Sequence, residues 1–253
     1  MRLLAAEWIK FRTLRSSLWS LAAAVGCALA VTVPAAGTVL TRIEPGHPPG
    51  QVASGVWAVA FFGVALSALV IGVLGVITMT GEHASGMIGL TYTAMPSRRG
   101  VLLAKAAVLT GAALTVLVLV GGLGYGYGRV VTARHDPAFL PPDAWRQIGA
   151  AALVLVMAAL LGLAFGALLR NGAVAVVVLM AVLYVIPLVV LSLPGGEDVG
   201  GFLPLAAGLE LLRQAPQTMP ASTAVAVCAA WALVPLAVAL AVSRRPGSTS
   251  RCL

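Results

Sequence analysis

The stretch LLGLAFGALLRNGAVAVVVLM, Leu160 to Met180, decides the fold, because it interrupts a long apolar run at two polar residues. The whole run extends from Ile148 to Leu193. One helical crossing of a hydrocarbon core about 30 Å thick takes roughly 20 residues, so this run has the length of two crossings. Arg170, followed by Asn171 and Gly172, favours the end of one helix and a cap for it. We therefore expect a helical hairpin; the alternative is one kinked helix.

Composition assigns the whole chain to a membrane. Of its 253 residues, 60% are hydrophobic and only 9% are charged, and the mean hydropathy is +1.01. A soluble domain cannot bury that much apolar surface. Because apolar runs of crossing length recur along the chain, we expect an all-α membrane protein with a single transmembrane domain, 1–253. Its six spans are expected at 17–40, 57–79, 101–124, 148–169, 172–193 and 221–242.

Basic residues are divided unequally between the two sides of these spans. Eleven of the 16 Lys and Arg fall on the side that holds the N-terminus, the segment 80–100, the hairpin and the C-terminus. The positive-inside rule therefore predicts that both termini and the segment 80–100 are cytoplasmic, in a multi-pass protein of the plasma membrane. The formal charge of +8 then indicates topology and does not indicate a nucleic-acid partner. The expected orientation anchors are Arg12, Arg15, Arg98, Arg99, Lys105 and Arg170.

The expected spans contain almost no ionisable side chain. Lys105, close to a cytoplasmic end where its side chain can reach the interface, is their only Asp, Glu, Lys, Arg or His. A carrier driven by protons or sodium needs ionisable or coordinating groups at membrane depth, and an ion channel needs charged rings or an ordered filter. A small channel or secondary carrier is therefore disfavoured, and we expect the energy for any transport to come from outside these helices.

No enzymatic site is expected in the chain. Its only two lysines, Lys10 and Lys105, lack the glycine-rich surroundings of a phosphate loop. Glu82 and His83 form a pair, whereas zinc needs at least three ligands, and the three cysteines have no paired spacing. Small residues four apart favour close packing of membrane helices. Such spacing occurs at Gly122/Gly126, Gly124/Gly128 and Gly162/Gly166.

The first 16 residues have the pattern of an amphipathic helix lying in the membrane surface. At about 100° per residue, Trp8 and Phe11 share a broad apolar face, while Lys10 and Arg12 lie elsewhere on the helix. Membrane lipids are thus an expected partner. Glu7 projects from the apolar face, so it needs a polar neighbour or a place at the edge. The alternative is a generic basic anchor beside the membrane.

Three stretches together carry a family resemblance. They are LLAAEWIKFRTLRSSLW (3–19), ITMTGEHASGMIGLTYTAMPSRRGVLLAKA (77–106) and ALLRNGAV (167–174). They resemble the membrane subunits of ABC-2 type transporters, especially the short six-span permeases of high-GC Gram-positive bacteria. The most specific element is a Glu after span two, followed by Ser, Thr and Gly, then Pro-x-Arg-Arg and a Lys. The likeness extends over essentially the whole chain.

The resemblance implies a separate ATP-binding subunit, which would hold ATP and magnesium, and a second permease, identical or different. It also implies that the N-terminal helix and a cytoplasmic coupling helix after span two rest on that ATPase. A docked helix of this kind can pass a rigid-body motion to spans two and three. The coupling residues implied are Glu7, Trp8, Glu82, His83, Met87, Leu90 and Tyr92. Glu82 is expected near the start of the coupling helix; alternatively, it only caps a helix and solubilises a loop.

The function expected from these patterns is export of an amphipathic drug, peptide or lipid by an ATP-driven complex. The alternative is a non-transporting anchor or sensor subunit that binds a soluble cytoplasmic partner. The outer loop 194–220 includes the near-helical spacing of Phe202, Leu205, Leu209 and Leu212. That spacing predicts a short helix on the outer surface, either as a gate or as an ordinary surface element.

Overall fold

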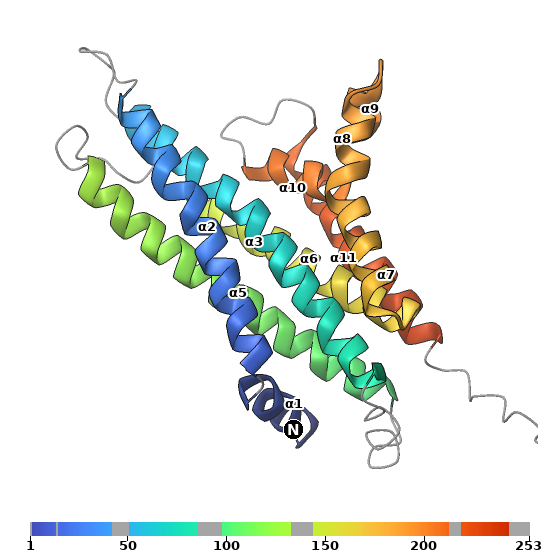
Figure 1. The fold of residues 1–253 in the computed structure, drawn as a ribbon. Coiled ribbons are helices and arrows are strands. Elements are labelled where there is room, and N and C mark those ends of the chain that lie inside the picture. Colours follow the sequence, from blue (N-terminus) through green and yellow to red (C-terminus); the bar gives the residue numbers. More distant parts are fainter. Residues whose placement is uncertain are drawn as a thin grey trace, which may run out of the picture.

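The computed structural model describes residues 2–13, 15–41, 51–84, 98–132, 144–212 and 219–242, and all the regular structure in them is helical (Figure 1). The long helices are α2 (Arg15–Thr41), α3 (Gln51–Ala84), α5 (Arg98–Thr132), α6 (Ala144–Leu169) and α11 (Ala221–Val242). The shorter elements are α1 (Arg2–Thr13), α7 (Gly172–Met180), the π-helical turn η1 (Ala181–Val185), α8 (Ile186–Leu191), α9 (Gly196–Gly200) and α10 (Pro204–Leu212).

Six helical segments are long and apolar enough to cross a membrane, as the sequence predicts. They are Arg15–Ala35, Gly63–Ala84, Arg99–Tyr127, Trp145–Leu169, Gly172–Leu191 and Ala221–Val242. On this length and composition, the chain is a multi-pass membrane protein. α3 continues to Ala84, beyond the expected end of span two, so Glu82 and His83 lie in its last turn. The expectation that Glu82 stands near the start of a helix is therefore wrong.

The break between α6 and α7 forms at the two predicted polar residues, but the helix ends are capped differently from the prediction. Arg170, and not a glycine, takes the left-handed conformation, with φ 55°. Asn171 then caps the start of α7, because its side chain accepts hydrogen bonds from the backbone N–H groups of Ala173 and Val174 at 3.1 and 3.3 Å. These bonds satisfy donors that a helix N-terminus leaves without partners. The result is two helices in place of one kinked helix.

The core of the bundle is the contact between α3 and α6, which are the two most buried spans (Figure 1). Glycines let their backbones touch: a Cβ added at Gly162 would lie 1.9 Å from the Gly72 carbonyl oxygen, and one at Gly166 would lie 2.9 Å from that of Val76. Close approach through small residues is the usual way for membrane helices to gain packing energy. The spacing Gly162/Gly166 thus has the predicted role, whereas Gly122 and Gly126 face open space.

α10, in the segment between spans five and six, does not lie on the surface as expected. α10 packs between α6 and α11, and most of its residues are buried. Its last carbonyl groups are held by the start of α6, where Arg146 and Gln147 donate to the backbone oxygens of Leu211 and Leu212 at 3.4 and 3.3 Å. The Trp231 indole of α11 donates to the Phe202 carbonyl at 3.0 Å. α10 is therefore an integral part of the bundle.

Candidate functional site: a buried charge cluster

The short helix α1 lies across one end of the bundle, against α5 and α2 (Figure 1). Its inward side carries Phe11, which is buried, and Glu7 one turn earlier, which is half-buried. Trp8 stacks on Phe11 with ring centroids 6.4 Å apart and remains half-exposed. The helix therefore brings one carboxylate towards the ends of the long helices. This is the polar neighbourhood that the position of Glu7 on the apolar face requires.

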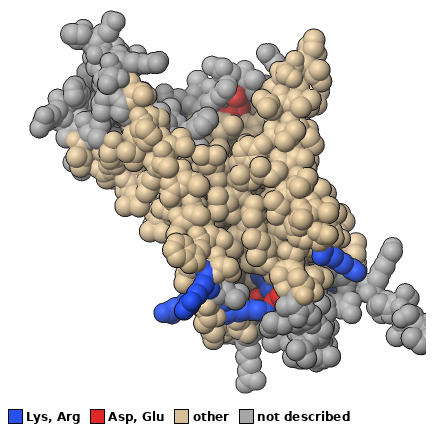
Figure 2. All heavy atoms as spheres, viewed as in Figure 1, with Lys and Arg blue, Asp and Glu red and all other residues tan. Residues whose placement is uncertain are grey.

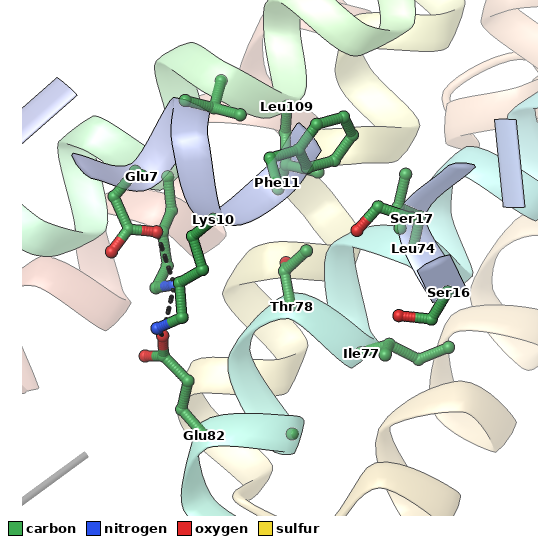
Figure 3. A pocket seen from close by; sticks show the side chains of 13 residues that line it. Glu7, Lys10, Phe11, Ser16, Ser17, Leu74, Ile77, Thr78, Glu82 and Leu109 are labelled. Atoms are coloured by element: carbon green, nitrogen blue, oxygen red, sulfur yellow. Dashed lines mark hydrogen bonds and ion pairs between the residues drawn. The ribbon is translucent and has the colours of Figure 1, made fainter. Parts of the chain in front are cut away.

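Two more charged side chains reach the same point from α3 and α5. Glu82 in the last turn of α3 is 6% exposed, and Lys105 in α5 is 4% exposed. The Lys105 Nζ donates to Glu7 Oε2 at 2.8 Å and to Glu82 Oε1 at 2.9 Å. Lys10 of α1 also donates from its Nζ to Glu82 Oε1 (Figure 3). We call Glu7, Lys10, Glu82 and Lys105 the charge cluster.

The charge cluster holds together because its formal charges cancel. A carboxylate near a helix C-terminus meets the negative end of the helix dipole, and the two ammonium groups bound to Glu82 offset this unfavourable interaction. Burying ions costs several kcal/mol each, and loss of one partner from such a pair costs about 3 to 5 kcal/mol. Removal of any member of the charge cluster should therefore lower the stability of the fold. Together the four side chains fix α1 to the ends of α3 and α5.

A pocket of about 330 Å³ lies beside the charge cluster, and Figure 3 shows the side chains around it. The cluster provides one wall. Hydroxyl groups and an apolar wall provide the others, and the pocket lies where α1, α2, α3 and α5 meet. Its lining outside the cluster consists of Phe11, Ser16, Ser17, Leu74, Ile77, Thr78, Gly81, Val108 and Leu109. The pocket is thus amphipathic, and its volume lies at the lower end of the usual range for ligand sites.

Of the residues implied for coupling, the structure brings Glu7 and Glu82 together and leaves others apart. Trp8 is close by on α1, whereas the His83 ring contacts its own helix through the Met79 carbonyl, 2.9 Å from Nδ1. The rest of the implied coupling helix, with Met87, Leu90 and Tyr92, lies outside the described residues.

Of the expected orientation anchors, the structure buries one and leaves others exposed. Lys105, expected to reach the membrane interface, is buried and paired with two carboxylates. Arg12, Arg15 and Arg170 are exposed and Arg99 is partly so, and Figure 2 shows Lys and Arg gathered at the end of the molecule that carries α1. We call this end, with Arg12, Arg15, Arg99 and Arg170, the basic end. The side chain of Arg98 is not among those described.

Sequence reasoning missed Lys10 as a member of the site. On the helical wheel it falls outside the apolar face, and only the placement of α1 against α3 gives it a carboxylate to bind. One signal was present: the chain has 16 Lys and Arg, only two of them Lys, and both lysines belong to the charge cluster. A compact ammonium on a flexible stem can serve carboxylates in several directions, which a planar guanidinium does less well.

Comparison with known proteins adds no narrower assignment. No family model matches the chain, and no curated protein is significantly similar to it. Among the described residues, no three His, Cys, Asp or Glu side chains gather as a metal site would require. The protein is an all-helical, multi-pass membrane protein.

Proposed function

We propose that the protein is the transmembrane subunit, or permease, of an ATP-driven ABC-2 type transporter. It would export an amphipathic drug, peptide or lipid across the plasma membrane, with a second permease and two ATP-binding subunits. The gathering of Lys and Arg at the basic end supports a cytoplasmic location for α1 (Figure 2). The ionisable groups of the described spans lie towards their ends, which favours energy from a separate motor over an ion gradient.

The charge cluster is the observation that carries this proposal. It fastens α1 to α3 and α5, which are spans two and three, through Glu7, Glu82 and the two lysines. Because packed helices joined in this way move as a unit, a displacement of α1 would reach both spans. The outer side of α1 has apolar side chains that a motor subunit could contact: Leu4, Trp8 and Ile9 are 50%, 48% and 61% exposed. The ATP and magnesium would be bound by that motor subunit.

Affinity purification from native membranes tests the proposal. We expect the tagged chain, extracted in a mild detergent, to bring down an ABC-type ATPase at equal stoichiometry, with vanadate-sensitive ATP hydrolysis. Trp8→Ala should reduce recovery of the ATPase because it removes an exposed contact of α1. Trp145→Ala is the matched control, since Trp145 is 82% exposed and begins α6 at the other end of the bundle.

An unrelated soluble partner, or none, would contradict the transporter assignment and favour the anchor or sensor alternative. Equal recovery of the ATPase with both variants would be consistent with the transporter assignment but would show that Trp8 does not contribute to the contact with the ATPase.

A further inference from the structure

The pocket beside the charge cluster has an unsatisfied polar wall. Ser17 is 2% exposed, lines the pocket, and its hydroxyl has no hydrogen-bond partner among the described residues. Ser16 precedes it in the first turn of α2, and Figure 3 shows the oxygens of both serines turned towards the interior of the pocket. Because the Ser17 oxygen is not enclosed by protein but opens into the pocket, it is available to a ligand that supplies a hydrogen-bond acceptor or donor.

The surroundings of Ser17 favour an acceptor that carries negative charge. The first N–H groups of α2, a helix of 27 residues, have no partner within the helix and carry partial positive charge. Lys10 belongs to the charge-cluster wall, across the pocket from the two serines (Figure 3); its ammonium has three donors, one of which reaches Glu82, and its side chain is 28% exposed. Hydroxyl groups and free backbone N–H groups at a helix N-terminus are a common binding site for phosphate in proteins.

The two carboxylates on the pocket wall narrow the class of ligand. Glu7 and Glu82 are compensated by the lysines, so the charge cluster as a whole does not repel a phosphate. Their oxygens can accept hydrogen bonds from a second part of the ligand that carries hydroxyl or ammonium groups. A ligand with a phosphate and a small hydrogen-bond donor can place the phosphate at the serine wall and the donor at the carboxylates.

The third wall is apolar and continues to the surface of the bundle. Leu74, Val108 and Leu109 are buried, whereas Ile77 is 43% exposed and Gly81 is also exposed. The last two therefore lie at the rim of the pocket, next to the surface that a membrane covers. A ligand with a polar head and an apolar tail can place its head inside and its tail along Ile77.

We propose that the pocket binds the headgroup of one membrane phospholipid, with its phosphate at Ser16, Ser17 and the first N–H groups of α2, and its headgroup donors at Glu7 and Glu82 on the opposite wall. Phosphatidylglycerol and phosphatidylethanolamine have this chemistry. The lipid contacts α1, α2, α3 and α5 at once, so it stabilises their junction. This site is independent of the transporter assignment, because it rests on the pocket alone.

Lipid binding to the purified, delipidated full chain in detergent tests the proposal. The probes are dioleoylphosphatidylglycerol, dioleoylglycerol, which has the same tails without phosphate, and glycerol 3-phosphate, which has no tails. We expect native mass spectrometry to retain one tightly bound phosphatidylglycerol per chain, and the unfolding temperature to rise saturably with that probe alone. Equal binding of dioleoylglycerol, or of glycerol 3-phosphate, would overturn the proposal, in favour of an apolar groove or of a free phosphate ligand.

Three variants assign the bound lipid to this pocket. Ser17→Leu should abolish the tight adduct by filling the pocket, whereas Ser20→Leu, one turn further along α2 and outside the lining, should retain it. Ser17→Ala is the milder variant and should weaken binding by roughly tenfold, as expected for one hydrogen bond to a charged group. Circular dichroism verifies that each variant is folded. Unchanged lipid affinity in Ser17→Ala, or equal retention in both leucine variants, would overturn the proposal.

Discussion

The Lys105 Nζ lies 2.9 Å from Glu82 Oε1 and thereby joins the start of α5 to the end of α3. The same ammonium binds Glu7 of α1 at 2.8 Å. One side chain thus connects three helices at a point where Lys105 is almost completely buried. The junction at the basic end therefore depends on electrostatics as well as on apolar packing.

Removal of Lys105 should destabilise the fold. Lys105→Met removes the ammonium that Glu7 and Glu82 share, and breaking a buried ion pair of this kind costs about 3 to 5 kcal/mol. The measurement is the free energy of unfolding in detergent, by denaturant titration. Arg12→Met is the control, because Arg12 is exposed at the same end and surface changes cost within about 0.5 kcal/mol. Equal stability of the two variants would show that the cluster is not a structural element.

Neutralising Glu82 should separate ATP hydrolysis from transport if the transporter assignment holds. Glu82→Gln keeps the size of the side chain but removes the charge that holds Lys10 and Lys105. We expect the permease–ATPase complex still to assemble, with fewer substrate molecules moved per ATP hydrolysed in proteoliposomes. Glu210→Gln is the control, since it makes the same change at a buried carboxylate in α10, at the other end of the bundle. Transport and ATPase rates equal to those of the parent complex would contradict a coupling role.

Addition of a single methyl group at the contact between α3 and α6 should lower the stability of the fold. In Gly162→Ala the new Cβ would meet the Gly72 carbonyl oxygen at 1.9 Å, and backbone cannot move aside as a side chain can. Overpacking of this kind costs about 1 to 3 kcal/mol. Gly122→Ala should instead be neutral or stabilise by up to about 1 kcal/mol, because that position faces open space within a helix. The unfolding temperatures of the two variants check both expectations, and a tolerated Gly162→Ala would refute the backbone contact.

The cap of α7 should contribute measurable stability. Asn171→Ala removes the acceptor for the backbone N–H groups of Ala173 and Val174, at a cost of about 1 kcal/mol. Asn171→Asp should retain most of the stability, since a carboxylate is an equally good cap. Both are compared with the parent protein by thermal unfolding. A stable alanine variant would mean that the hairpin is held by tertiary packing alone.

The orientation inferred from the basic residues can be checked by labelling with a membrane-impermeant maleimide. In a background without native cysteines, Val199→Cys in α9 should react in intact cells, because Val199 is exposed at the end opposite α1. Arg12→Cys, exposed at the basic end, should react only after the cells are permeabilised. The reverse pattern would invert the topology and would exclude a cytoplasmic motor at α1.

The sequence predicted the hairpin because a run of twice the crossing length has few alternatives in a bilayer. It also indicated Glu7, as a carboxylate on an apolar helix face has to find a partner. Lys10 and the pocket could not be predicted, since both depend on how α1 is placed against α3 and α5. α10 was misplaced for a related reason: its apolar stripe suits a lipid surface and a protein surface equally.

The touching backbones of α3 and α6 also restrict the motions open to the protein. Helices separated by side chains can slide past one another, but two backbones in contact at Gly72 and Gly162 have no clearance for a sliding step. Any change of shape must therefore move α3 and α6 together, as one unit, relative to the surrounding helices. Span five has a natural place to bend, because the π turn Ala181–Val185 interrupts its regular hydrogen bonding just before Pro187.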